Sequence, residues 1–301
     1  MTSHLTLPVP AHDGAPAPAP VAVRLGDAGA HRTACVLAPV MARWDQGVSL
    51  ASVTGALTSS GHRVAVYDTL SLLREGDDLA ALTGRWADVL RAEEPDVLVG
   101  NALGGAVVQH LLARPWTHRA RVVLVSAPTV ADGPLDAALE RIAATVGSHG
   151  TAAALRLLHE MVRGPADAAA DHRCGDHGSA ASSERDRDRA AAPGRASGGA
   201  HHAERPPDDD PLPGWRLATG LRLLHRADAR RSVEAFPGRL LHLYGTESRL
   251  VRRHHLATGR GHARVGIPQA GMRPHTDQPE ATRRAVTSFL GTPLTKRTHA
   301  Q

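Results

Sequence analysis

One glycine-rich stretch of this chain has the layout of a catalytic turn but lacks a residue that could react. Residues 96–110 read DVLVGNALGGAVVQH, an apolar strand-like run followed by a glycine turn and a helical segment. In the G-x-S-x-G pattern, such a turn presents a serine hydroxyl beside a backbone N–H that stabilises an oxyanion. Ala102 stands where that serine would stand. The sequence therefore predicts the turn without its nucleophile.

This stretch closely resembles the nucleophile elbow of the α/β-hydrolase superfamily, whose members often read G-N-S-L-G-G at this point. Residues 239–251, RLLHLYGTESRLV, look like the strand and loop that present the family's acid, with Ser248 at the aspartate position. Residues 267–280, IPQAGMRPHTDQPE, resemble the loop of the family's histidine, with Met272 at the position of the general base. The three stretches follow the family's chain order of nucleophile, acid and base.

The resemblance covers residues 33–163 and 214–291 and implies the α/β-hydrolase fold. It does not imply hydrolysis, because the residues at its three triad positions cannot do the chemistry. Ala102 has no nucleophile, Met272 cannot accept a proton, and Ser248 carries no charge that would stabilise an imidazolium. We interpret the chain as a degenerate member of the superfamily, a pseudoenzyme with respect to hydrolysis.

Two other residues are weak catalytic candidates. His275 lies three residues past the lost base, and an imidazole can titrate near neutral pH. A second histidine is common in the family's H-x-P-H loop, however, and a structural role is the better supported interpretation. Ser126 ends an apolar strand and could face the pocket, but ordinary hydrogen bonding at a strand end accounts for it more simply.

The resemblance also implies a small-molecule pocket at the carboxyl ends of the strands. The family's oxyanion loop commonly begins His-Gly, whereas this chain has Ala38 and Pro39. We expect a hydrophobic or acyl-containing ligand, and we expect it to contact the residues at the mouth of this pocket: Ala38, Pro39, Ala102, Leu103, Ser248 and Met272.

Neither a metal nor a cofactor is expected. The pairs His201–His202 and His254–His255 and the run Asp208–Asp210 lack the spacing that places three ligands around one ion. The glycine turn has neither the G-x-G-x-x-G spacing nor the lysine of a phosphate-binding loop. Solvated loop residues are the simpler account of the histidines and aspartates.

The periodicity of apolar residues predicts a doubly wound, mostly parallel sheet. Short runs of apolar residues alternate with helical segments, as expected for strands that are buried on both faces. Helices are predicted over residues 49–60, with Gly61 after the end, and after Asp78. The predicted strands are residues 33–37, 63–67, 97–99, 122–125, 240–243 and 265–267.

The chain divides into an interrupted core, a Pro/Ala-rich leader, a low-complexity insert and a tail. Between Val162 and Trp215 the one large aliphatic residue is Leu212, too little apolar surface to offset the entropy of ordering the backbone. This segment is predicted to be a disordered insert in place of a cap, and translation of part of it from a shifted reading frame is the less favoured alternative. The predicted parts are a flexible leader with an edge strand near its end (1–30), core (31–163), insert (164–213), core (214–292) and tail (293–301).

The composition limits the kinds of partner that the chain is expected to bind. The net charge is +5 and the pI about 10.1, yet Lys296 is the one lysine and aromatic residues make up 3%. Nucleic-acid binding would need basic residues grouped with stacking aromatics, so it is not expected. The sequence has no secretory leader and no apolar run of about 18 residues, which predicts a cytoplasmic protein with no membrane span. The oligomeric state is left open.

Three functions remain open. The first is a non-hydrolytic small-molecule enzyme of the lyase, cyclase or isomerase type in bacterial secondary metabolism, although most such members of the superfamily keep the histidine base. The second is a catalytically inactive homologue that binds a ligand or a protein partner, which suits a pocket made apolar by Ala102 and Met272. The third is an esterase or thioesterase that uses substitute residues.

Overall fold

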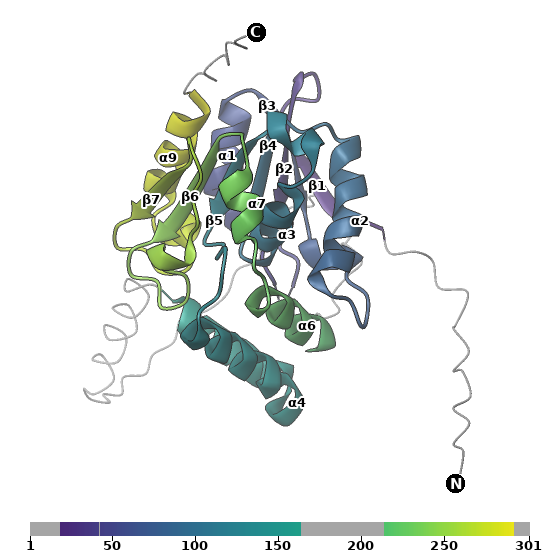
Figure 1. Ribbon diagram of the computed structural model, residues 1–301, viewed down its shortest axis with the longest axis vertical. Helices are drawn as coiled ribbons and strands as arrows, with labels where there is room; N and C mark the ends of the chain where they lie inside the picture. The colour runs from purple at the N-terminus through teal and green to yellow at the C-terminus, as the bar shows by residue number, and fades with distance from the viewer. Residues whose placement is uncertain (1–18, 42, 164–213, 292–301) are drawn as a thin grey trace, which may run out of the picture.

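The computed structural model describes residues 19–41, 43–163 and 214–291 (Figure 1). The predicted insert of residues 164–213, the tail and most of the leader lie outside the described residues. Within the described part, seven strands form one sheet in the order β1-β3-β2-β4-β5-β6-β7. The strands are β1 (Ala22–Leu25), β2 (Arg32–Leu37), β3 (His62–Tyr67), β4 (Val97–Asn101), β5 (Arg121–Val125), β6 (Leu240–Gly245) and β7 (Ala263–Ile267).

The strands from β2 to β7 run parallel, which confirms the predicted doubly wound sheet. β1 alone is antiparallel, and it pairs with β3 so that Ala22 lies opposite Tyr67. The edge strand expected near the end of the leader is present, since residues 22–25 belong to the sheet. Backbone pairing with β3 and the packing of Val23 and Leu25 against the core account for this strand.

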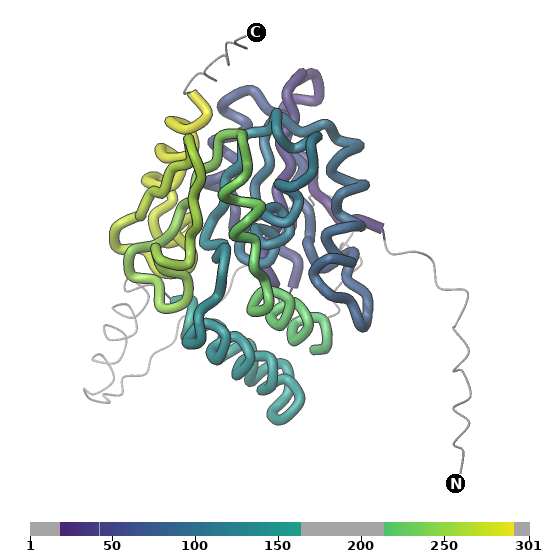
Figure 2. The backbone as a smooth tube through the Cα atoms, in the orientation of Figure 1, coloured from purple at the N-terminus to yellow at the C-terminus, as the bar shows by residue number. Residues whose placement is uncertain are grey.

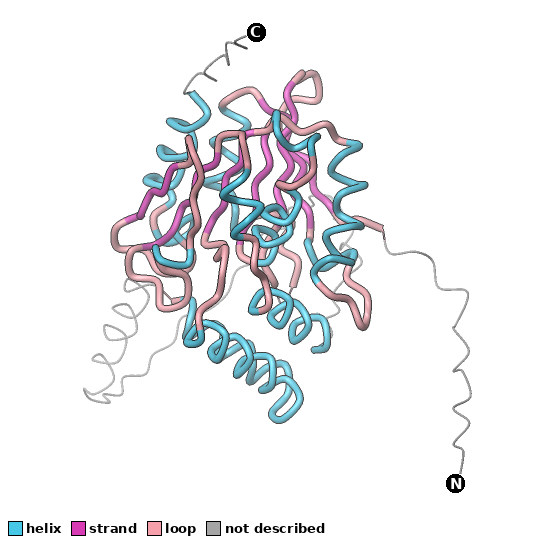
Figure 3. Tube along the Cα trace, viewed as in Figure 1, coloured by secondary structure: helices cyan, strands magenta, loops and turns pink. Residues whose placement is uncertain are grey.

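Helices cover both faces of the sheet (Figure 3). Side chains of α1 (Ala51–Ser59) and α9 (Pro279–Gly291) pack in one core cluster with the residues on one face of the strands. Side chains of α2 (Leu79–Ala92), α3 (Leu103–Leu111) and α7 (Arg230–Ala235) pack in a second cluster on the other face. The short elements are η1 (Val48–Leu50), η2 (Thr69–Leu72), η3 (Pro115–Arg119), η4 (Arg253–His255) and α8 (Pro274–Asp277).

The two predicted helices begin and end where their flanking residues favour it. The first is η1 followed by α1, and Gly61 comes after its end with a φ of +78°, which glycine adopts without strain. The second is α2, whose first turn is capped because the Asp78 carboxylate accepts from the Ala81 N–H.

Two further helices, α4 (Gly133–Val162) and α6 (Gly214–His225), lie against each other beyond one edge of the layers (Figure 2). α4 is broken at Gly150, whose φ of +81° and ψ of 167° are not helical. Arg222 of α6 donates to both carboxylate oxygens of Glu140 on α4, at 3.0 to 3.2 Å. The residues that flank the predicted insert thus form helices that pack against each other. No helix of the described residues is both long and apolar enough to cross a membrane.

Candidate functional site

Ala102 occupies a strained turn between β4 and α3. Its φ of 47° and ψ of −110° lie outside the regions that residues with a Cβ adopt readily. The turn is fixed on both sides, because the Ala102 N–H donates to the carbonyl of Val125 and its own carbonyl accepts from the Ala106 N–H. The sharp strand-to-helix turn predicted from the glycine pattern is present, and a methyl group stands at its apex.

The glycines around Ala102 allow β4 and α3 to approach closely. A Cβ added at Gly104 would lie 2.3 Å from the carbonyl oxygen of Leu37, and one at Gly100 would lie 2.5 Å from the Cα of Gly105. Backbone atoms cannot move away from such contacts as a flexible side chain can. The packing of the turn therefore requires glycine at these positions, whatever residue stands at 102.

The acid and base positions of the resemblance lie in direct contact. The Ser248 hydroxyl, on the loop after β6, donates to the Met272 sulfur at 3.8 Å and accepts from the Val251 N–H at 3.1 Å. Asp277 holds the loop of Met272, since its carboxylate accepts from the Gly271 N–H at 2.7 Å. Ala102, Ser248 and Met272 are each less than a tenth exposed. This arrangement offers one uncharged hydroxyl and a thioether where proton transfer would need an imidazole and a carboxylate.

His275 is buried behind the turn. Its Nε2 lies 3.4 Å from the Asn101 amide nitrogen, and its backbone carbonyl accepts from the Ser52 hydroxyl. Among the described residues, no partner is found for its Nδ1. Burial, together with the positive charge of Arg273, lowers the pKa of His275 to about 4. The ring is therefore neutral at pH 7 and covered by its neighbours.

Ser126, the other weak candidate, is fully buried, with a φ of 45°. Its N–H donates to the carbonyl of Leu243, which continues the pairing of β5 with β6. Its hydroxyl finds no partner among the described residues. A side chain with no exposed surface cannot touch a ligand in this conformation, so its position favours a structural role.

The backbone groups of Ala38, in the predicted oxyanion loop, are already hydrogen-bonded to neighbouring residues. The Ala38 N–H donates to Tyr67, and the Ala38 carbonyl accepts from the Thr69 hydroxyl at 2.5 Å. Pro39 has no N–H to offer. α6 lies close over this region, because a Cβ at Gly220 would come within 2.9 Å of the Val40 side chain and 3.4 Å of the Leu103 side chain.

Of the predicted ligand-contacting residues, Ser248 lines a cavity of about 550 Å³. Its other lining residues come from the end of β6 and from the segment through η4, and they include Tyr244, Glu247, Arg249 and Arg252. Ala102, Leu103 and Met272 belong to one core cluster of buried side chains, which also contains residues of α6. Three of the predicted residues thus share one apolar cluster and Ser248 contacts one of them, whereas Ala38 belongs to the cluster on the other face. The cavity beside Ser248 is lined mainly by polar and charged residues.

One grouping has the composition of a metal site that sequence spacing did not reveal. Asp132 lies beside His254 and His255, with all three possible ligand atoms within 4.8 Å of one another. Both Nε2 atoms lie about 3 Å from the same carboxylate oxygen of Asp132, at 3.0 and 3.1 Å. The Arg252 N–H donates to Nδ1 of His255, which leaves the ring hydrogen on Nε2, facing the carboxylate. This tautomer favours a hydrogen-bond network over metal coordination.

Asp132 also caps α4, since its other carboxylate oxygen accepts from the Leu135 N–H. That hydrogen bond, with those from the two histidines, lowers the pKa of Asp132 to about 2. Sequence reasoning missed Asp132 because it lies more than 120 residues from the histidine pair, and no spacing rule connects residues that only the fold brings together. Its cap position before a helical segment was the one available signal.

Comparisons with known proteins agree on the fold. No family model and no curated protein matches the sequence. Among solved structures, an α/β-hydrolase enzyme from a deep-sea metagenome library of the Medee basin is 12% identical, with a TM-score of 0.65 over 93% of this chain and 96% of that one. The enol-lactonase from Burkholderia xenovorans is 16% identical, with a TM-score of 0.64 over 91% and 96% of the two chains.

A hydrolase from Pseudomonas aeruginosa is 20% identical, with a TM-score of 0.63 over 90% of this chain and 94% of its own. At such identities the likeness concerns the path of the backbone and not the chemistry of the site. The order and direction of the strands, the turn at Ala102 and these likenesses together show that the chain has the α/β-hydrolase fold.

Proposed function

We propose that this protein binds a small molecule through a hydrolase-type site and does not hydrolyse it. The observation that carries the proposal is the contact between Ser248 and Met272, at 3.8 Å, on the same side of the sheet as the methyl group of Ala102. The positions that the resemblance assigns to acid, base and nucleophile hold no group that can ionise near neutral pH. The residues at these positions can therefore contact a ligand, but they cannot act on it as nucleophile, acid or base.

The character of the site suits a ligand with an apolar or acyl-containing body. Ala102 and Met272 are apolar and keep a small exposed fraction, and Ser248 supplies a hydroxyl at the edge of a cavity. Binding sites of this kind combine apolar walls with a few placed polar groups, which fix the orientation of the ligand.

A second candidate is a non-hydrolytic enzyme of the lyase, cyclase or isomerase type, of the kind found in bacterial secondary metabolism. One observation favours it: His275 is a neutral imidazole within reach of Asn101, near the strained turn. Its burial opposes a role as base, since a substrate would have to displace the packing around the ring. Esterase or thioesterase activity with substitute residues ranks last, because no nucleophile stands at the turn.

Recovery of the bound compound tests the proposal. The full chain is incubated with a panel of acyl compounds that includes methyl octanoate, octanoate and octanol, and both the melting temperature and the composition of the mixture are measured. We expect at least one compound to raise the melting temperature in proportion to its concentration and to be recovered unchanged. Product that accumulates with protein concentration, or the absence of stabilisation by every member, would contradict the proposal.

A further inference from the structure

A cavity with a basic lining lies at the end of β6. Its volume is about 550 Å³, and it is formed by the last residues of β6, the loop that follows and η4. Arg249, Arg252 and Arg253 line it, together with the carboxylate of Glu247. Three guanidinium groups against one carboxylate leave the lining with a net charge of +2 while His254, which also belongs to it, is uncharged.

The three guanidinium groups are not neutralised within the described part of the chain. No carboxylate there, that of Glu247 included, lies within ion-pair distance of any of them. The carboxylate of Asp132, which lies beside His254, is occupied by the Leu135 N–H and by two histidine rings. All three arginines are exposed. Their charge is therefore available to an anion that enters the cavity.

The backbone that carries these arginines is anchored. Leu250 and Val251, which stand between the first and the second of them, are buried and belong to the core cluster that contains Met272. The Val251 N–H donates to the Ser248 hydroxyl at 3.1 Å. The Arg252 N–H donates to Nδ1 of His255 at 2.9 Å. Because the backbone is held in place, only the arginine side chains lose freedom when an anion binds.

Tyr244 gives the same cavity an aromatic wall. It pairs with Gly266 of β7, and a Cβ at Gly266 would lie 3.1 Å from both Cζ and the hydroxyl oxygen of Tyr244. The ring thus lies over a position that has no side chain, and glycine makes room for it. A ring beside charged groups offers apolar surface to the organic part of a ligand whose head group is ionic.

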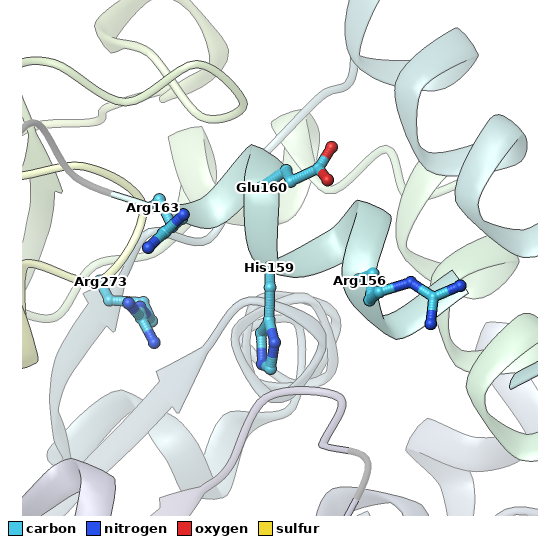
Figure 4. Close-up of a pocket in the computed structure, with 5 residues that line it drawn as sticks. All are labelled: Arg156, His159, Glu160, Arg163 and Arg273. Atoms are coloured by element: carbon cyan, nitrogen blue, oxygen red, sulfur yellow. The ribbon is translucent and has the colours of Figure 1, made fainter. Parts of the chain in front are cut away.

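A second basic cavity differs in the state of its arginines. It has a volume of about 490 Å³ and lies between the end of α4 and the residue that precedes α8 (Figure 4). Two of its three arginines, Arg163 and Arg273, already interact with other residues. Figure 4 shows the third, Arg156, pointing away from both. The arginines at the end of β6 are, by contrast, available to a ligand.

We propose that the cavity at the end of β6 binds the phosphate group of a small phosphate monoester. Such a group carries a charge of about −1.5 to −2 at pH 7, which matches the net charge of the lining, whereas a carboxylate would offset half of it. A guanidinium presents its N–H donors in a planar fork that pairs with two phosphate oxygens. This inference goes beyond the proposed function, which does not use these arginines. Ser248 is common to both, because it lines the cavity and contacts Met272 at 3.8 Å.

Calorimetric titration of the full chain at constant ionic strength tests the inference, at about pH 7.5 so that the phosphate is a dianion. Phenyl phosphate, phenyl sulfate and phenol are the probes, because they share one ring and differ in charge. We expect phenyl phosphate to bind at least about threefold more tightly than phenyl sulfate, since an exposed charge pair is worth about that factor, and phenol to show no measurable binding. Equal affinity for the phosphate and the sulfate would overturn the inference.

Substitutions locate the phosphate group. The double substitution Arg249→Ala and Arg252→Ala should weaken binding of phenyl phosphate by about tenfold, and lysine at both positions should recover part of the loss. Glu247→Gln removes the carboxylate from the lining and should increase the affinity. The matched control is the double substitution Arg91→Ala and Arg156→Ala, which removes the same charge from exposed positions outside the cavity and should leave the affinity unchanged.

Two results with these variants would overturn the inference. The first is binding of phenyl phosphate that is insensitive to the loss of Arg249 and Arg252. The second is an equal loss of affinity in the control, because the net charge of the protein and not this cavity would then attract the anion. Unaltered melting temperatures of the unliganded variants show that the fold is intact. None of the probes has an acyl chain, so either result leaves the proposed function standing.

Discussion

The Ser248 hydroxyl lies 3.8 Å from the Met272 sulfur, and the same oxygen accepts from the Val251 N–H at 3.1 Å. Strands β6 and β7 bring together two loops whose defining residues are 24 positions apart. The close approach is built into the backbone, since a Cβ at Gly245 would lie 1.9 Å from the carbonyl oxygen of Gly271. The scaffold that could hold a carboxylate against an imidazole is thus present with other residues on it.

This contact predicts the outcome of rebuilding the relay. The triple substitution Ala102→Ser, Ser248→Asp and Met272→His should make the residue at position 102 reactive toward a fluorophosphonate. The contact between the second and third positions would place a carboxylate beside an imidazole, and the three groups act as a unit. Intact mass measures the adduct. Ala102→Ser alone should stay unlabelled, because an unassisted hydroxyl is a poor nucleophile near pH 7, and labelling of this single variant would contradict the assignment.

Glycine at position 102 should stabilise the fold. The φ of 47° and ψ of −110° at Ala102 are accessible to glycine without a Cβ penalty. Ala102→Gly should raise the free energy of unfolding by about 1 kcal/mol, the lower end of what a strained residue costs. Urea denaturation measures the change. Ala106→Gly, one turn along α3, is the matched control and should instead cost about 1 kcal/mol or more. Equal destabilisation by both changes would show that the turn carries no strain.

Gly104 should not tolerate alanine. An added Cβ would lie 2.3 Å from the Leu37 carbonyl oxygen, which belongs to the paired backbone of β2. We expect Gly104→Ala to lower the free energy of unfolding by about 3 kcal/mol or more. Gly84→Ala in α2 is the control, because no atom lies within 4 Å of the place that its Cβ would take, and it should raise stability by about 1 kcal/mol. A neutral Gly104→Ala would mean that α3 does not lie this close to the backbone of β2.

The fold could be predicted from the sequence because its signals are local. The apolar runs at 97–99 and 240–243 identify strands buried on both faces, and Gly61 and Asp78 mark helix boundaries through their own backbone preferences. The antiparallel edge strand at 22–25 was only partly predicted, since it has four residues and half-exposed side chains. Its order depends on pairing with β3.

The sequence indicated which loops hold the candidate residues, but it could not indicate which of their side chains are in contact. The resemblance placed Ser248 and Met272 in loops at the carboxyl ends of strands, but nothing in the sequence says that the hydroxyl donates to the sulfur. The contact of Asp132 with His254 and His255 joins elements more than 100 residues apart. Such contacts depend on how α4 lies against the rest of the fold, which periodicity does not encode.

The burial of His275 predicts how stability changes with pH. Its pKa of about 4 in the folded state lies below the ordinary value of 6.5, so between these values the unfolded chain binds more protons than the folded one. The neutral, buried ring of His275 therefore contributes on the order of 3 kcal/mol to the free energy of unfolding. This contribution is fully present above about pH 6.5 and is lost as the pH falls toward 4. Urea denaturation of wild type and His275→Gln from pH 4 to 7.5 measures it. The variant should show a shallower slope, and identical slopes would contradict the buried position of the ring.

The most direct test of the account is the reaction of the wild-type chain itself with activated esters and a fluorophosphonate. With a methyl group at the turn and a thioether at the base position, we expect p-nitrophenyl ester hydrolysis no faster than a small background and no covalent adduct by intact mass. Turnover of esters that is lost on His275→Ala would contradict the account, because a displaced base would then be acting in a site whose triad positions hold none.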